Sequence, residues 1–292
     1  MRILILGHKG MLGSELLLRL LPQHEVTGYD LPECDIASRE SCWAAIEAVA
    51  PEVVINAAAF TDVDGCETQP ERCFAVNAAG VVNLAAACRA RGALLIHFST
   101  DYVFDGTKSA PYVEDDECRP LNVYGQSKLA GERFLRESGA DFLLVRTAWL
   151  YGRRGKNFVR TILAKARAGE PLAVVNDQIG SPTYAYDLAR AVQVLLEGEH
   201  RGVFHVTNRG TCSWHQFAVA IVKYAGLEVA VKPIGSEKLP RPARRPAYSV
   251  LSNGKFIAAT GKTMRYWQLA LQDCLEHLGY TSQSFPGNGH RK

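Results

Sequence analysis

Strand and helix patterns alternate over the first 150 residues, and this alternation restricts the fold more than any other feature. Residues 2–7 (RILILG) form an apolar run ending in glycine, typical of a strand buried on both faces of a sheet. Apolar residues at helical spacing follow at 11–21. Further strands are expected at 24–30, 51–59, 93–100 and 141–149, and further helices at 38–50, 71–92 and 126–138. Right-handed crossovers then predict an α/β fold with a Rossmann-like doubly wound parallel sheet.

The regularity weakens after about Tyr151. Helices are expected at 158–169, 186–198 and 213–226, with a strand at 202–208. The proline- and arginine-rich residues 232–251 predict an extended surface loop. We therefore expect a Rossmann domain over 1–150 and a smaller C-terminal substrate-binding lobe over 151–280, from which some segments return to the core domain. Residues 281–292 lack apolar periodicity and are expected to be a mobile tail.

Composition excludes several classes of partner. A net charge of +3 without a basic stripe or basic amphipathic helix argues against nucleic acid or membrane binding. No apolar run is expected to reach the roughly 20 residues that span a bilayer, and Met1 leads directly into a strand rather than an export signal. The eight cysteines form no CxxC pair and are expected to be reduced core residues. These features predict a soluble cytoplasmic protein.

Three glycines follow the first strand and open the first helix, in the segment GHKGMLG. In this context the pattern predicts a dinucleotide site: Gly7 permits a tight turn, Gly10 lets amides approach a pyrophosphate, and Gly13 lets helix and strand pack closely. The alternative is a turn in which glycine serves geometry alone. Asp30 ends the second strand, where an acid can accept the ribose hydroxyls of NAD, unless it is a solvated turn residue. No arginine follows Asp30, which favours NADH over NADPH.

The segment YGQSK places Tyr124 and Lys128 four residues apart on one helix face. A phenol with a pKa near 10 is a poor acid at neutral pH, but a nearby ammonium group lowers its pKa. Thr100 ends the fourth expected strand, where open α/β sheets bind ligands, and its hydroxyl can hydrogen-bond a substrate carbonyl oxygen. Tyrosine and lysine at this spacing are common by chance, so the prediction depends on the order of these motifs.

In sequence, the glycine motif, NAAA (56–59), STDYVFDG (99–106) and YGQSK (124–128) resemble the extended short-chain dehydrogenase/reductase family. Within that family, AAFTDVDGCE, PLNVYGQSKLAGE, RTAWLYG, NDQIGSPT and ARRP resemble the dTDP-4-dehydrorhamnose reductases, over residues 1 to about 280. The resemblance implies NAD(P)H-dependent reduction of the 4-keto group of dTDP-4-dehydro-L-rhamnose to dTDP-L-rhamnose, for cell-surface polysaccharide.

The resemblance also implies roles for particular residues. Tyr124 would protonate the developing alkoxide, Lys128 would lower the tyrosine pKa and hold the cofactor ribose, and Thr100 would orient the carbonyl. Further cofactor contacts implied, beside the glycines and Asp30, are Met11, Leu12, Asp35, Ile36, Ala59, Phe60 and Thr61. Substrate contacts implied are Thr100, Asp101, Tyr102 and Trp149. Trp149 and Tyr102 could instead be packing residues, and Asp101 a turn cap.

Three other groups of residues keep two interpretations. Asn176, Asp177 and Gln178 form either a polar loop or contacts to a nucleotide or sugar. Arg244 and Arg245 lie either in a solvated loop or against a diphosphate. His8 is expected to be a solvent-facing filler rather than an acid or base.

The resemblance implies a bound metal and a homodimer for some members of the family only. Some members of the family carry Mg²⁺ between paired subunits, and Glu15 matches one carboxylate of that site. Asp187 stands where a glutamate is expected, which leaves Mg²⁺ binding in doubt, and Glu15 could lie on a solvated helix face.

Besides another NDP-sugar reductase of the same family, two other functions on the same fold remain open. An epimerase would return its hydride within one turnover, whereas a 4,6-dehydratase would need a second acid directly after Asp101, where Tyr102 stands. A non-catalytic regulatory subunit is the other alternative, against which the intact Thr100, Tyr124 and Lys128 argue.

Overall fold

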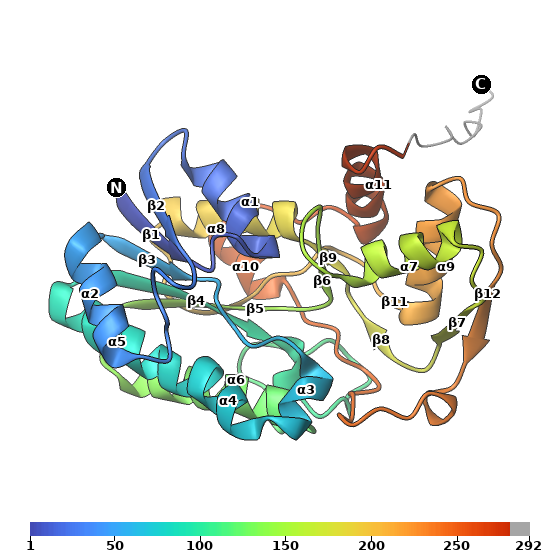
Figure 1. Ribbon diagram of the computed structural model, residues 1–292, viewed down its shortest axis with the longest axis horizontal. Coiled ribbons are helices and arrows are strands. Elements are labelled where there is room, and N and C mark those ends of the chain that lie inside the picture. Colours follow the sequence, from blue (N-terminus) through green and yellow to red (C-terminus); the bar gives the residue numbers. More distant parts are fainter. Residues whose placement is uncertain (281–292) are drawn as a thin grey trace.

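The computed structural model describes residues 1–280 of the 292-residue chain, and the mobility expected for 281–292 lies outside these residues. Figure 1 shows a large sheet covered by helices on both faces, with a smaller lobe beside one end of the sheet. The carboxyl ends of the sheet strands face this lobe, so the junction between the two parts is where an open α/β sheet binds its ligands.

The central sheet has six parallel strands in the order β10-β5-β4-β3-β1-β2. Its strands are β1 (Arg2–Leu6), β2 (Glu25–Tyr29), β3 (Val53–Asn56), β4 (Leu94–Thr100), β5 (Phe142–Thr147) and β10 (Gly202–His205). The predicted Rossmann-like, doubly wound parallel sheet is thus confirmed. Because β2 lies on one side of β1 and β3 on the other, the direction of winding reverses there, which opens a crevice beyond the ends of β1 and β3.

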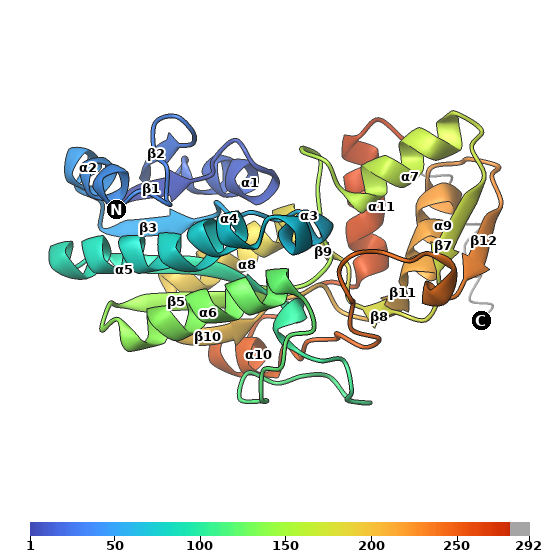
Figure 2. The ribbon, with the colours of Figure 1, turned by 60° about the horizontal axis from the view of Figure 1, so that its bottom comes forward.

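Helices cover both faces of this sheet, as Figure 2 shows. One face carries α1 (Met11–Leu20) and α8 (Ala185–Glu197), with α10 (Gly254–Thr260) beside β10. The opposite face carries α2 (Arg39–Val49), α5 (Gly80–Arg91) and α6 (Val123–Glu137). Every residue of β4 is buried, which explains why the central strands read as continuous apolar runs rather than alternating ones.

A long helical stretch precedes β4. It consists of α4 (Pro70–Phe74), a π-helical turn (Ala75–Ala79) and α5, and it follows the short helix α3 (Val63–Thr68). The stretch has 22 residues, and its most apolar window has a mean hydropathy of 1.4. By length and composition alone, this helix could cross a membrane. The expectation that no stretch reaches that length was therefore wrong. Half of the window is buried inside the protein, so core packing accounts for the apolar composition.

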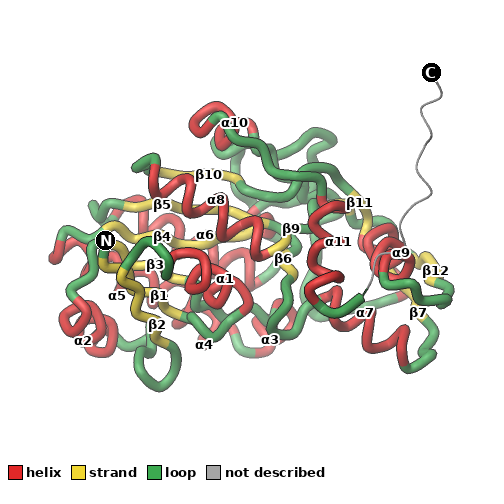
Figure 3. Tube along the Cα trace, turned by 90° about the horizontal axis from the view of Figure 1, so that it is seen from above, coloured by secondary structure: helices red, strands yellow, loops and turns green. Residues whose placement is uncertain are grey.

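The lobe packs its own core around three two-stranded sheets, shown in yellow in Figure 3. The pairs are β6 (Leu150–Tyr151) with β9 (Thr183–Tyr184), β7 (Leu172–Val175) with β12 (Val231–Ile234), and β8 (Ile179–Gly180) with β11 (Cys212–Ser213). Its helices are α7 (Phe158–Arg167), α9 (Trp214–Tyr224) and α11 (Trp267–His277). The start of the expected loop 232–251 is therefore a strand, in which Pro233 is tolerated because the pair is a small edge sheet.

Candidate active site

The glycine loop is shaped by close backbone contacts. Gly7 has φ +77°, and a Cβ at this position would lie 2.8 Å from the Ala58 nitrogen on the neighbouring loop. A Cβ on Gly13 would collide with the Gly7 carbonyl oxygen. Gly10 is the N-cap of α1 and has no side chain to satisfy the first amides of the helix, which carries no acidic residue in its first turn. The loop thus fits a pyrophosphate, held by the amides that follow Gly10.

Asp30 follows β2 directly, and its carboxylate is hydrogen-bonded to the glycine loop. Its Oδ2 accepts a hydrogen bond from the Lys9 nitrogen at 3.2 Å, and its Oδ1 accepts one from the Leu31 nitrogen at 3.0 Å. The ring of His8 lies over Gly28, where a Cβ would be 2.6 Å from the ring carbon Cγ. His8 is half-buried and therefore faces solvent only in part, because the missing side chain of Gly28 makes room for the imidazole.

Other residues implied at the cofactor lie around the ends of β1, β2 and β3. Met11 and Leu12 begin α1, and Ala59, Phe60 and Thr61 follow β3. The Asp35 side chain is exposed and accepts a hydrogen bond from the Ala37 nitrogen. The Ile36 side chain is buried in the core, where only its main chain is left for a ligand.

Asn77 is a residue that the sequence analysis missed. From the π-helical turn, its Oδ1 accepts from the Phe60 nitrogen at 2.9 Å and its Nδ2 donates to the Phe60 carbonyl at 3.0 Å. The Asn77 amide also reaches the hydroxyl of Ser127 on α6 at 3.1 Å. It therefore fixes the loop after β3 relative to the helix that carries Tyr124 and Lys128. A buried asparagine within an apolar helix is the signal that could have pointed to it.

The first turn of α6 is anchored on three sides. Asn122 caps the helix by accepting from the Gly125 nitrogen at 2.8 Å, and the Glu67 carboxylate accepts from the Val123 nitrogen at 2.8 Å. Gly125 is needed because a Cβ there would collide with the Tyr102 carbonyl oxygen. These contacts hold Tyr124 near the turn that follows β4. Its ring lies edge-on to that of Tyr102, with the ring centroids 6.1 Å apart.

Lys128 is buried against a neutral histidine. Its Nζ lies 3.2 Å from His97 Nε2, and His97 Nδ1 lies 3.1 Å from the amide nitrogen of Asn56. The Ala58 nitrogen donates to Asn56 Oδ1, so the amide nitrogen of Asn56 faces the ring. Burial and the neighbouring ammonium hold the pKa of His97 well below its usual value, and burial lowers the pKa of Lys128 to about 8.

The structure does not show the expected lowering of the Tyr124 pKa by Lys128. Burial, followed by the charge of Asp101, raises the pKa of Tyr124 above its usual value, and a hydrogen bond with Thr100 opposes this rise. The phenol therefore keeps its proton at neutral pH. A proton donor needs that form, but the neighbouring carboxylate makes the phenol a weaker acid.

Thr100 and Asp101 lie together at the end of β4. The Thr100 hydroxyl donates to Asp101 Oδ1 at 3.0 Å and accepts from the Tyr102 nitrogen at 3.2 Å. Asp101 is 2% exposed, and burial raises its pKa to about 7. Tyr102 and Arg245 lie close enough to shift each other's pKa, which brings this turn beside a loop of the lobe.

Trp149 stands at the junction between the sheet and the lobe. Its ring stacks on Trp214 with centroids 3.6 Å apart and 7° between the planes. The same ring covers Gly180, where a Cβ would lie 2.6 Å from the indole nitrogen. The backbone of Trp149 has φ +47°, which is uncommon for a bulky side chain and is often found at functional sites.

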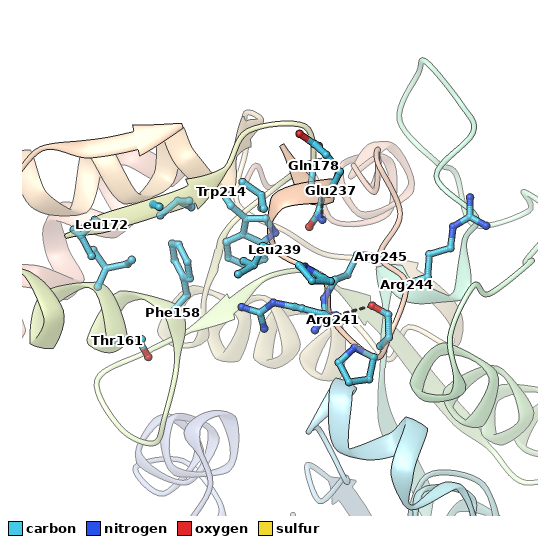
Figure 4. Close-up of a pocket in the computed structure, with 18 of the residues that line it drawn as sticks. Phe158, Thr161, Leu172, Gln178, Trp214, Glu237, Leu239, Arg241, Arg244 and Arg245 are labelled. Carbon is cyan, nitrogen blue, oxygen red and sulfur yellow. Dashed lines mark hydrogen bonds between the residues drawn. The ribbon is translucent and has the colours of Figure 1, made fainter. Parts of the chain in front are cut away.

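A cavity of about 910 Å³ opens between the lobe and the turn that carries Tyr102. Figure 4 shows apolar and aromatic side chains on one side, including Phe158, Leu172 and Trp214. The opposite side carries Arg241, which extends toward the middle of the cavity, whereas Arg244 points away from the other labelled side chains. Lys165 and Arg245 also line the cavity, and Glu237 is the one acidic residue among the lining residues. The cavity therefore suits a ligand with an aromatic base and negative charge.

The arginine loop is tied to the Rossmann part by Asp64 on α3. The Asp64 carboxylate accepts from Arg245 Nη1 at 2.8 Å and Nη2 at 2.9 Å, and from Arg241 Nη1 at 3.3 Å. These arginines hold the pKa of Asp64 below its usual value. Asn122 donates to the Arg244 carbonyl at 2.7 Å, so the N-cap of the helix that carries Tyr124 also fixes this loop.

All three polar residues at 176–178 form hydrogen bonds within the lobe. Asp177 accepts from the Ser236 nitrogen and hydroxyl, and Asn176 accepts from Ser213 at 2.7 Å. Gln178 donates to the Ser236 hydroxyl at 2.9 Å and lines the cavity.

The carboxylates considered for Mg²⁺ have arginine partners. Glu15 is buried and accepts from Arg153 through both oxygens, with Nε 2.9 Å from Oε1. Asp187 accepts from Arg265 Nε and from Asn208 Nδ2, each at 2.8 Å. Within residues 1–280, no group of three or more His, Cys, Asp or Glu side chains could hold a metal. The residues do not fit Mg²⁺, because guanidinium groups already neutralise both carboxylates.

Comparisons with known proteins agree with this arrangement. The family described as the RmlD substrate binding domain matches residues 1–280. The dTDP-4-dehydrorhamnose reductase of Burkholderia thailandensis is 41% identical over 295 residues, which cover 95% of this chain and 99% of that protein.

Two solved structures share the whole fold. A dTDP-4-dehydrorhamnose reductase from Clostridium acetobutylicum is 42% identical, with a TM-score of 0.92 over 96% of this chain and 100% of that chain. The enzyme of that name from Bacillus anthracis, solved in complex with NADP, is 36% identical, with a TM-score of 0.92 over 94% of this chain and 99% of that chain. Because this family's model matches residues 1–280 and a relative more than 40% identical aligns along nearly its whole length, the chain belongs to the RmlD substrate binding domain family.

Proposed function

We propose that this protein is an NAD(P)H-dependent dTDP-4-dehydrorhamnose reductase, which converts dTDP-4-dehydro-L-rhamnose to dTDP-L-rhamnose. The observation that carries the proposal is the position of Thr100 and Tyr124. Both lie beside Tyr102 at the carboxyl edge of the sheet, between the glycine cradle on one side and the arginine-lined cavity on the other. The relatives that carry this name cover nearly the whole chain.

The residues of the chain divide the reaction between them. The reduced nicotinamide, when bound, supplies a hydride to the carbonyl carbon C4 of the sugar. Thr100 orients the carbonyl oxygen, and Tyr124 Oη gives its proton to that oxygen as negative charge develops on it. Lys128 holds the cofactor ribose from the same helix face as Tyr124. The product is a C4 hydroxyl, and Tyr124 regains its proton from solvent before the next turnover.

The cavity accounts for the nucleotide part of the substrate. Trp214 and Phe158 line the cavity with aromatic rings that suit a base, and Arg241 and Arg245 offer guanidinium groups for the two phosphates. Because Asp64 on α3 fixes Arg245, the diphosphate would be held at a set distance from Tyr124.

The cofactor site carries groups suited to either reduced nicotinamide. Asp30 can accept from the ribose hydroxyls of NADH, and the exposed Lys9 ammonium beside it can approach the 2′-phosphate of NADPH. The relative from Bacillus anthracis was solved with NADP. We expect both cofactors to serve, and the ratio of their kcat/KM values measures the preference.

The test is to mix purified protein with dTDP-4-dehydrorhamnose and NADH or NADPH, follow nicotinamide absorbance, and identify the sugar product. Consumption of one cofactor per sugar with formation of dTDP-L-rhamnose is expected. The absence of oxidation with either cofactor would overturn the proposal. Product formation without net cofactor consumption would indicate an epimerase, which returns its hydride within one turnover. Binding of both ligands without turnover would indicate a non-catalytic role.

A further inference from the structure

Asp101 is a buried carboxyl group that the reaction above does not use. It lies on the turn Asp101–Val103 directly after β4, and its side chain is 2% exposed. Its Oδ2 is buried and has no hydrogen-bond partner among the described residues. The hydroxyl of Ser249 approaches the carboxyl group closely enough to lower its pKa, but burial outweighs this effect. A charged carboxylate in this position is therefore costly.

No cation within residues 1–280 forms an ion pair with this carboxyl group. Arg245, which shifts the pKa of the adjacent Tyr102, is held by the carboxylate of Asp64 instead. The other titratable groups that face this region are Tyr102 on the same turn and Tyr124 on α6, and the charge of Asp101 raises the pKa of both. Asp101 thus opposes the charge that develops near it during proton transfer.

The hydrogen bonds of Thr100 connect Asp101 to the reaction. A threonine hydroxyl has one proton to donate. When Asp101 is ionised it can only accept, and the Thr100 proton is directed at its Oδ1, 3.0 Å away. The Thr100 oxygen then accepts from the Tyr102 nitrogen. In this state Thr100 has no proton left for a substrate carbonyl oxygen.

Protonation of Asp101 reverses this arrangement. A neutral carboxyl group can donate its own proton to the Thr100 oxygen across the same 3.0 Å contact. The Thr100 proton is then free to turn toward the substrate, and the negative charge beside Tyr124 is gone. Both changes favour the movement of a proton from Tyr124 to the carbonyl oxygen.

We propose that Asp101 is a positioning residue: its neutral form directs the Thr100 hydroxyl proton to the substrate carbonyl, and its ionised form withdraws that proton. The inference rests on the proposed reductase function and assigns Asp101 a role through Thr100. Because burial raises the pKa of Asp101 to about 7, kcat/KM should fall as pH rises through 7. Lys128, whose pKa is lowered to about 8, sets a second decline at higher pH.

The experiment compares Asp101→Asn with the wild-type enzyme in pH profiles of kcat/KM. The amide keeps the shape of the side chain but cannot ionise. The decline near pH 7 should disappear in this variant, leaving the one that Lys128 sets about one pH unit higher. Asp105→Asn is the matched control: it removes a carboxylate from the same segment, one that bonds Thr107 and Tyr112 rather than Thr100. Its profile should decline at the wild-type pH.

A second measurement does not depend on turnover. Infrared difference spectra of the wild-type protein, recorded across a pH titration, should show a carboxylic acid carbonyl band that titrates near pH 7 and is missing in Asp101→Asn. A profile of Asp101→Asn that declines at the wild-type pH, or the absence of such a band, would overturn the inference. If the wild-type protein shows no reductase activity, the proposed function fails, and the infrared band still decides the protonation of Asp101.

Discussion

The two walls of the active site are built by different means. The cofactor wall consists of short segments at the ends of adjacent strands, and its shape depends on backbone contacts such as that between Gly7 and the loop at Ala58. The substrate wall is assembled from segments near residues 158–178, 214 and 236–245, which side-chain contacts join to one another and to the Rossmann part. A backbone cradle tolerates little change in the glycines, whereas a cradle of side chains can be loosened without loss of the fold.

Tyr124→Phe should have the largest effect, because it removes the proposed proton donor, which lies between the two walls. We expect turnover to fall about 10³-fold, the usual contribution of a general acid. Cofactor binding, measured by nicotinamide fluorescence, should remain within about threefold of the wild type, since no cofactor contact of the glycine loop changes. Full activity in this variant would show that another group donates the proton.

Gly13→Ala tests the backbone character of the cofactor wall. The added Cβ collides with the Gly7 carbonyl oxygen, so helix α1 must move away from β1. We expect the free energy of unfolding to fall by about 1–3 kcal/mol, together with a clear loss of cofactor affinity. Gly254→Ala is the control, since its nearest neighbour would be the Ser252 hydroxyl at 3.3 Å. Equal effects of the two substitutions in denaturant melts would contradict the steric explanation.

Asp64→Ala tests the side-chain character of the substrate wall. The substitution frees Arg245 and Arg241 from α3, so the arginine loop should lose its fixed position. The KM for the nucleotide sugar should rise about tenfold, as expected for the loss of hydrogen bonds to a charged group, while the Kd for the cofactor should not change. Asp141→Ala, which breaks an exposed ion pair with Arg201, serves as the control and should alter neither constant. A parallel rise in the cofactor Kd would mean that the two walls are not independent.

Removal of divalent cations should have the smallest effect. Arg153 and Arg265 already neutralise Glu15 and Asp187, so a chelator should change kcat/KM by less than about twofold. Loss of a bound metal would cost about tenfold or more. The measurement is the steady-state rate before and after dialysis against chelator, with Mg²⁺ added back as the control. Recovery of a lost rate on adding Mg²⁺ would show a metal site that the arginines do not exclude.

The parts of the fold that the sequence predicted are those where the signal is local. The apolar runs at β1, β3, β4 and β5 and the helical periodicity between them predicted the parallel sheet, because each burial pattern is set within a few residues. The short strands of the lobe were missed, since pairs such as β8 with β11 are two residues long and form only when distant segments meet.

The site shows the same division. Gly7, Gly13 and Gly125 occupy positions where only glycine fits, which the motifs around them indicated in part. Asn77 and Asp64 escaped notice because neither stands within a few residues of the groups that it holds. The environment of Tyr124 was also out of reach, since the expected influence of Lys128 was replaced by that of Asp101, a residue 23 positions earlier in the chain.

The sequence by itself determined the order of strands and helices, the glycine cradle and the pairing of Tyr124 with Lys128 on one face of α6, because each depends on spacing along a single element. Only the tertiary structure decided the protonation chemistry and the shape of the substrate wall. Burial beside Thr100, not spacing, raises the pKa of Asp101 to about 7, and contacts from α3 to the arginine loop place the guanidinium groups. Desolvation and charge pairing act through space, so residues far apart in the chain set them together.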